Sequence, residues 1–174
     1  AYYGKYYIDN NNPFTAWHEI IDLSRILNEN ATHYPATLPD RMNVRLWARH
    51  FATQVCVDNS EAGFGSPGNC YGDELKLYLD PADGQFDIFP WDMDAVVGSN
   101  ARLWNWSGVA APLVTKFLFN PPVLPSYVGD VHDIMTGVMS HPEMEALLDS
   151  MGSKMTGTKT SWLNTLTAQR NGLL

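Results

Sequence analysis

Alternation of apolar and polar residues near the middle of the chain predicts two short strands. Leucines occupy every second position in residues 75–80, and apolar side chains alternate again in 85–90. A period of two is typical of strands. Between the two runs, the sequence DPADG supplies a proline that fixes φ and a glycine that tolerates positive φ. The pattern therefore predicts an antiparallel hairpin in which 75–80 pair with 85–90.

Apolar residues at spacings of three and four predict helices on both sides of this hairpin. Before it, one helix follows Thr15 as its N-cap, and a second, with a wide apolar stripe that must be well buried, spans 44–55. After it, apolar stripes recur in 127–138, 144–155 and 162–166. The predicted fold class is α+β, mainly helical with one short hairpin.

Two further stretches lack a helical period. Residues 1–12 are rich in Tyr and Asn, a composition that predicts a strand leading into the domain. Residues 58–73 are rich in glycine and are predicted to form a loop directly before the hairpin. Cys56 and Cys70 bracket most of this loop. A disulfide between them would stabilise the domain by about 3 kcal/mol through loop closure, and the alternative is two unrelated thiols.

The hairpin ends in Pro90-Trp91-Asp92-Met93-Asp94, and a proline cannot continue the strand ladder. Two aspartates at i and i+2 in an extended chain point the same way, and they repel each other unless a cation or a proton intervenes. Oxygen ligands of this kind suit Mg²⁺ or Mn²⁺. The spacing alone leaves an acidic surface loop as the alternative.

Composition limits the classes of partner. The chain has 174 residues, of which 45% are hydrophobic, and a net charge of −8. This length fits one domain, and the acidic balance argues against a nucleic acid or an anionic membrane as the partner. No apolar run approaches the length of a membrane span, so we expect a soluble chain. Motifs of zinc proteases, serine hydrolases and P-loop NTPases are absent from the sequence.

The run LYLDPADGQFDIFPWDMDAVVG resembles the signature of the CotH family, the spore-coat-protein-H-like atypical protein kinases. The residues that fit the signature in order are Leu77, Tyr78, Asp80, Pro81, Gly84, Phe86, Pro90, Trp91, Asp92, Asp94 and Gly98. The resemblance implies a kinase-C-lobe-like domain that, with ATP and Mg²⁺ or Mn²⁺, transfers phosphate to protein Ser or Thr residues. It covers nearly the whole chain.

The same resemblance implies which residues bind the metal, and it also shows one position where this chain differs from the family. Asp92 and Asp94 are expected to hold the metal, as the D-F-G aspartate does in protein kinases. Where the family has an asparagine before the first strand, this chain has Glu74. A glutamate still binds Mg²⁺ or Mn²⁺, so Glu74 is expected to contribute to cofactor binding, and the alternative is a solvated charge at the strand edge.

The catalytic base is expected in the loop between the second helix and the hairpin. Asp58 is the preferred candidate because it lies closest to the rigid end of the helix, with Asn59 beside it as a cofactor-binding residue. Glu61 is the other candidate, since the inserted glycines leave the alignment open.

The whole chain, 1–174, is expected to be one domain that corresponds to the C-terminal portion of the family's domain. A complete kinase needs an N-terminal nucleotide-clamping lobe with a phosphate-binding lysine, and Lys5 is the only lysine before Lys76. Either the chain is part of a longer parent protein, or it is a degenerate member without that lobe. We expect a protein substrate or a surface or coat partner, and a secreted, cell-surface or spore-surface location.

Two other function classes stay open. A noncatalytic coat or surface protein would use the same fold as an interaction platform. A metal-dependent hydrolase would need only a water and carboxylates, which Asp58, Glu74, Asp92 and Asp94 would supply.

Overall fold

The computed structural model describes residues 16–29, 34–59, 75–91, 93, 96, 113–152 and 158–174. Its elements in chain order are α1 (Ala16–Asn28), α2 (Tyr34–Thr37), the 3-10 helix η2 (Leu38–Asp40), α3 (Val44–Cys56), β1 (Leu75–Leu79), β2 (Phe86–Pro90), the π-helix η3 (Leu113–Leu118), α4 (Leu124–Thr136), α5 (His141–Met151) and α6 (Lys159–Leu173). The predicted α+β class, mainly helical with one hairpin, is confirmed. The strand expected in 1–12 and the Thr15 cap lie outside the described residues.

The predicted hairpin is confirmed. β1 pairs antiparallel with β2, from Leu75 opposite Pro90 to Leu79 opposite Phe86. The turn between them closes through its own side chains, because the carboxylate of Asp80 accepts a hydrogen bond from the backbone N–H of Ala82 at 2.8 Å. Gly84 has a φ of +72°, which only glycine adopts without strain. The turn residues therefore determine the register of the strands.

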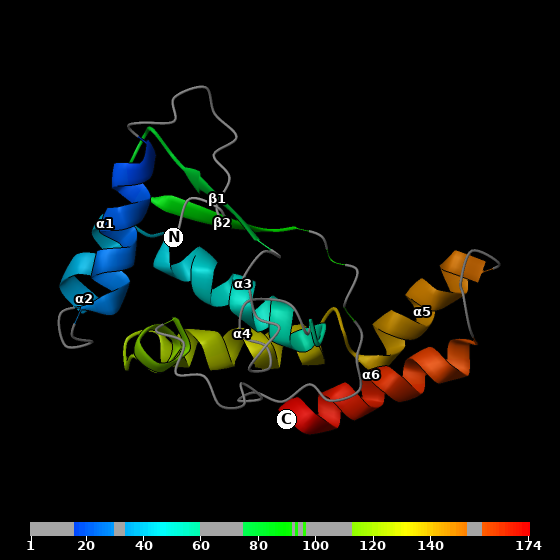
Figure 1. The fold of residues 1–174 in the computed structure, drawn as a ribbon. Coiled ribbons are helices and arrows are strands. Elements are labelled where there is room, and N and C mark those ends of the chain that lie inside the picture. Colours follow the sequence, from blue (N-terminus) through cyan, green and yellow to red (C-terminus); the bar gives the residue numbers. More distant parts are fainter. Residues whose placement is uncertain are drawn as a thin grey trace, which may run out of the picture.

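Helix α3 lies at the centre of the domain, with the hairpin along one side and α4 along the other (Figure 1). Trp47 and Phe51 of α3 make edge-to-face contacts with Phe117 of η3, with ring centroids 6.4 Å and 6.2 Å apart. The buried residues of α3 include polar as well as apolar side chains: Trp47, Ala48, His50, Phe51, Ala52, Gln54, Val55 and Cys56. The expectation that this helix is well buried is confirmed.

The hairpin is fixed to the first turn of α3 through Phe86. Met42 forms a parallel bridge with Phe86, whose backbone N–H donates to the carbonyl of Arg41 at 2.8 Å. The indole N–H of Trp47 donates to the carbonyl of Phe86 at 2.6 Å, inside the core. The side chain of Asn43 accepts the N–H of Leu46 and so caps α3 at the same point. The start of β2 is thereby attached to the start of the helix.

On its other side, α3 is joined to α4 by an ion pair. The guanidinium of Arg45 binds both carboxylate oxygens of Asp130, with Nη2 at 2.7 Å from Oδ1. Asp130 is buried, and this hydrogen-bonded carboxylate raises the pKa of Arg45. A bidentate pair of this kind compensates for the burial of the charge of Asp130.

The apolar stripe predicted for 127–138 is only partly the buried face of α4. Val128 is 38% exposed, whereas Asp130 is buried, and Val138 lies beyond the end of α4 and is 72% exposed. The helix buries the face that meets α3, and the pair with Arg45 allows Asp130 to lie on that face. In α5, Leu148 is buried but Leu147 is 50% exposed. This helix packs mainly on α6 (Figure 1), so it buries only a narrow strip.

Replacing Trp47 with Phe tests the attachment of the hairpin to α3. The change removes the indole donor to the buried carbonyl of Phe86 and leaves a small cavity, so we expect the free energy of unfolding to fall by about 2 to 4 kcal/mol. Urea unfolding measures the loss. Trp91→Phe is the matched control, because Trp91 is 52% exposed. Equal losses in both variants would contradict the anchoring role of Trp47.

Candidate functional site

The C-terminal end of α3 places Asp58 and Asn59 in a defined turn. The N–H of Asn59 donates to the carbonyl of Gln54, and the N–H of Asp58 to that of Val55, each at 3.0 Å. These two bonds form the Schellman motif that ends many helices. Asp58 occupies its left-handed position with a φ of 49°, where glycine is usual. The backbone at the predicted base is therefore determined by the helix end.

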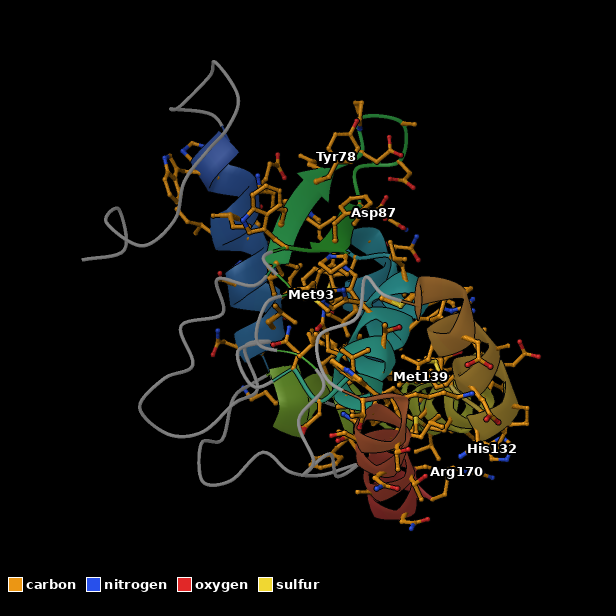
Figure 2. The ribbon with its side chains drawn as sticks, turned by 90° about the vertical axis from the view of Figure 1, so that its right-hand side faces the viewer. Tyr78, Asp87, Met93, His132, Met139 and Arg170 are labelled. Atoms are coloured by element: carbon orange, nitrogen blue, oxygen red, sulfur yellow. The ribbon has the colours of Figure 1, made fainter. Side chains whose placement is uncertain are left out.

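The exit of the hairpin lies against this turn through Met93. The side-chain N–H₂ of Asn59 donates to Oε1 of Gln54 at 2.9 Å and to Sδ of Met93 at 3.5 Å. Nε2 of Gln54 donates to the same sulfur at 3.6 Å. Figure 2 shows Met93 between the hairpin and α3. The structure thus brings the Asp58–Asn59 turn and the exit of β2 into direct side-chain contact.

The other predicted site residues lie outside the described residues. These are Glu74, Asp92 and Asp94, together with Glu61. Asp92 and Asp94 are nevertheless the covalent neighbours of Met93, and consecutive Cα atoms in a trans chain are about 3.8 Å apart. The contact of Asn59 with Met93 therefore links the predicted base segment to the predicted metal segment.

The described residues do not by themselves form a metal site. Within the ranges that the structure describes, no group of three or more His, Cys, Asp or Glu side chains is arranged to hold a metal ion. Asn59 uses its Nδ2 on Gln54 and Met93, so the atom of this amide that can ligate a cation is Oδ1. Carboxylate and amide oxygens are the ligands that Mg²⁺ and Mn²⁺ take.

The buried His50 lies next to Gln54, on the side of the amide away from the Asn59 contact. His50 and Gln54 are one helical turn apart on α3, and their Nε2 atoms are 3.4 Å apart. Burial lowers the pKa of His50 to about 4, so its imidazole is neutral near pH 7. The sequence reasoning did not identify His50, Gln54 or Met93 as site residues. The signal that would have found His50 and Gln54 is a pair of polar residues four apart on the apolar helix 44–55, and no such local signal marks Met93.

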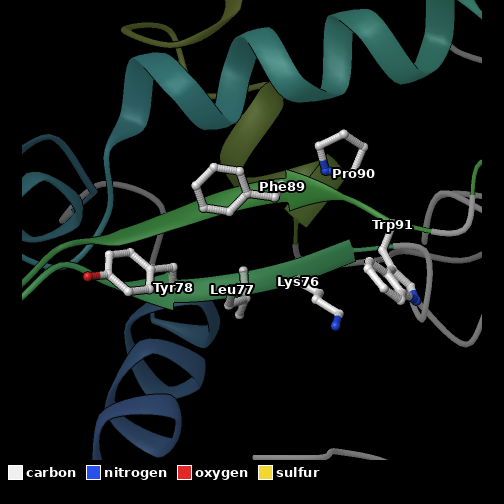
Figure 3. Close-up of a pocket in the computed structure, with 6 residues that line it drawn as sticks. All are labelled: Lys76, Leu77, Tyr78, Phe89, Pro90 and Trp91. Atoms are coloured by element: carbon white, nitrogen blue, oxygen red, sulfur yellow. The ribbon is translucent and has the colours of Figure 1, made fainter. Parts of the chain in front are cut away.

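The outward face of the hairpin carries exposed aromatic rings. Nζ of Lys76 lies 3.6 Å from the ring centroid of Trp91, a cation–π contact. Tyr78 and Phe89 are also about half exposed, at 52% and 47%. Together with Leu77 and Pro90 these residues line an open hollow of about 620 Å³ (Figure 3).

Cys56 is a buried free thiol, so the alternative of an unbridged cysteine holds for it. Its Sγ lies 3.9 Å from the carbonyl oxygen of Val131, in the interface between α3 and α4. Burial raises the pKa of this thiol to about 12. Cys70 lies outside the described residues.

The fold and this contact define a mainly helical α+β domain in which a hairpin delivers its exit segment to the end of a buried helix. The chain belongs to the CotH family, because the model of the CotH kinase protein family matches residues 1–161. The kinase-like assignment made from the hairpin signature is thereby confirmed at the level of the family. A comparison with curated proteins finds no match.

The depressed pKa of His50 predicts a pH dependence of stability. Because the folded-state pKa of about 4 lies below the ordinary 6.5, the unfolded chain binds more protons between these values. The free energy of unfolding should therefore fall as the pH drops from about 6.5 to 4, by roughly 3 kcal/mol at about 1.4 kcal/mol per pKa unit. Urea unfolding between pH 7 and 4 measures it.

The His50→Gln variant should show a shallower pH dependence than the unchanged protein. His132→Gln serves as the control, because the side chain of His132 is 64% exposed. A pH dependence of His50→Gln as steep as that of the unchanged chain would show that another group causes the loss of stability.

Proposed function

We propose that this domain, within its parent protein, transfers phosphate from ATP to Ser or Thr residues of a protein substrate, with Mg²⁺ or Mn²⁺ as the cofactor. Membership of the CotH kinase family supports the reaction class. The single observation that carries the proposal for this chain is the contact of Asn59 with Met93, which joins the turn of the candidate base to the segment of the candidate metal ligands.

In this proposal the residues have separate roles. Asp58 accepts the proton of the substrate hydroxyl, from a backbone position that the end of α3 determines. Asp92 and Asp94 hold the metal, and Asn59 and Glu74 contribute to cofactor binding. When bound, the cation would neutralise charge on the phosphates during transfer. Phosphoryl transfer depends mainly on positioning and electrostatic stabilisation, which a rigid helix end and an anchored hairpin exit provide.

We also propose that the chain is the C-terminal portion of a larger catalytic domain and that a nucleotide-clamping lobe belongs to the rest of the parent. The outward face of the hairpin supports this, because Tyr78, Phe89 and Trp91 are each about half exposed there. Exposed aromatic side chains that gather on one face are typical of a surface that another component covers.

A noncatalytic surface or coat protein is the second candidate function, and the same aromatic face favours it. In that case the face would contact a protein partner directly and no nucleotide would be needed. Either function fits a secreted protein of the cell or spore surface. None of the helices that the structure describes is long and apolar enough to cross a membrane. ATP-dependent labelling of a protein substrate separates the two functions.

Titration with Mn²⁺ tests the metal site. Asp92→Ala should weaken Mn²⁺ binding at least about 10-fold, since a cation held by one or two carboxylates loses a main ligand. Isothermal titration of the parent protein, with and without nucleotide, measures the affinity. Asp87→Ala is the control, because Asp87 lies within β2, before the D-x-D pair. Unchanged affinity in Asp92→Ala would remove this residue from the metal site.

Asp58→Gly separates the structural role of Asp58 from its proposed catalytic role. Glycine adopts the left-handed position freely, so the free energy of unfolding should stay unchanged or rise by up to about 1 kcal/mol. The turnover number should fall about 100-fold or more, the size of a general-base contribution, with little change in nucleotide affinity.

Asp58→Asn and Glu61→Gln complete the design. Asp58→Asn should lower the turnover number in the same way, because the amide cannot accept the proton, and Glu61→Gln should have little effect. The opposite result, loss of activity in Glu61→Gln alone, would place the base three residues further along the loop. Full activity in Asp58→Gly would exclude Asp58 as the base.

A further inference from the structure

We infer that Gln54 is a positioning residue: together with Asn59 it holds the thioether of Met93, and through Met93 it positions the segment that carries Asp92 and Asp94. The inference deepens the proposed function and rests on it for the role of the two aspartates. The contacts of Gln54 and Asn59 with Met93 are all between residues that the structure describes.

The contacts converge on one atom. Gln54 is 2% exposed, and its Nε2 lies 3.6 Å from Sδ of Met93. Asn59 donates to the same sulfur at 3.5 Å, and its Nδ2 also donates to Oε1 of Gln54 at 2.9 Å. The two amides and the sulfur therefore form a closed triangle. Each N–H to sulfur bond is weak, but two from fixed donors restrict where the sulfur can lie.

The orientation of the Gln54 amide is set by partners on both sides. Its Oε1 receives the N–H of Asn59, and its Nε2 faces the ring nitrogen Nε2 of His50 at 3.4 Å. A neutral imidazole nitrogen without a proton accepts this N–H. If the amide were flipped, its oxygen would face the sulfur and its N–H₂ would face the N–H₂ of Asn59. The orientation that donates to Met93 is therefore the one that satisfies all partners.

Packing alone gives no reason for a glutamine at this position. A leucine of similar size would fill the space without polar groups that need partners, since a buried amide costs free energy unless it is hydrogen-bonded. Met93 is separated from Asp92 and from Asp94 by one peptide bond each. A contact that restrains Met93 therefore restrains the backbone that joins the two aspartates, and a misplacement of about 1 Å can lower the rate of an enzyme about 100-fold.

Hydrogen exchange and Mn²⁺ affinity together test this inference. The variants are Gln54→Leu, Met93→Leu and the double variant, in the full parent protein. Gln169→Leu is the matched control, because Gln169 is also fully buried but lies on α6. Exchange mass spectrometry of the peptide that covers 88–97 reports on the segment without any metal or nucleotide. Titration with Mn²⁺ reports on its ability to bind a cation.

Gln54→Leu should speed amide exchange in 88–97 and weaken Mn²⁺ binding, each by about 5- to 10-fold, the effect of losing one or two hydrogen bonds. Met93→Leu should act similarly, and the double variant should be no worse than either single variant, because the two residues act as one contact. Gln169→Leu should leave both quantities unchanged.

Different outcomes separate the inference from the proposed function. Unchanged exchange in Gln54→Leu, or additive effects in the double variant, would overturn the positioning role. Faster exchange together with unchanged Mn²⁺ affinity would also overturn it, since the contact would then be merely structural. Faster exchange in a protein that binds no Mn²⁺ even when unmutated would support the anchor on Met93 and overturn the proposed metal site instead.

Discussion

The hydrogen bond from the indole N–H of Trp47 to the carbonyl of Phe86 fixes where the hairpin begins on α3, and the geometry of the site follows from it. From Asn43 to Val57 the helix rises about 21 Å at 1.5 Å per residue. Seven residues of chain beyond Phe86 can span up to about 23 Å at 3.3 Å per residue, which is long enough to reach the end of the helix. The contacts of Met93 with Gln54 and Asn59 show that the chain does reach it. The exit of β2 therefore meets the turn at Asp58 and Asn59.

The domain contains buried polar side chains and exposed aromatic side chains, two features that ordinary packing does not explain. Gln54, His50 and Asp130 are buried, and each is hydrogen-bonded to a residue from another turn of helix or from another element. Outside, Tyr78 and Trp91 expose about half of their surface on the hairpin. Buried polar and exposed aromatic residues are the exceptions that need an explanation. Here Gln54 and His50 lie at the end of α3 beside the strand exit, and Asp130 joins α4 to the start of α3 through Arg45.

The hairpin could be predicted from the sequence because its signals are local. Alternation in 75–80 and 85–90 and the DPADG turn act over a few residues, and the observed register agrees with them. The structure brings the turn at Asp58 and Asn59 beside the hairpin exit, and because Asp92 and Asp94 lie outside the described residues, the site itself stays a prediction.

The burial of individual side chains could not be predicted in the same way, since it depends on partners far along the chain. Gln54 is buried against Met93, and Asp130 against Arg45 of a different helix. Val138 is exposed although it continues the apolar stripe, because α4 ends at Thr136, before this residue. A helical period identifies an apolar face, but the partner that covers the face decides which of its residues are buried.

Asp58 occupies the left-handed backbone position that ends α3, where glycine is usual. A non-glycine residue in this region costs about 1 kcal/mol relative to glycine, and aspartate adopts it more readily than most side chains do. Glycine would end α3 by the same two hydrogen bonds at lower cost, and the loop that follows is rich in glycine. Under the proposed function, the carboxylate of Asp58 is the proton acceptor that a glycine at this position would lack, on the same turn whose Asn59 contacts Met93.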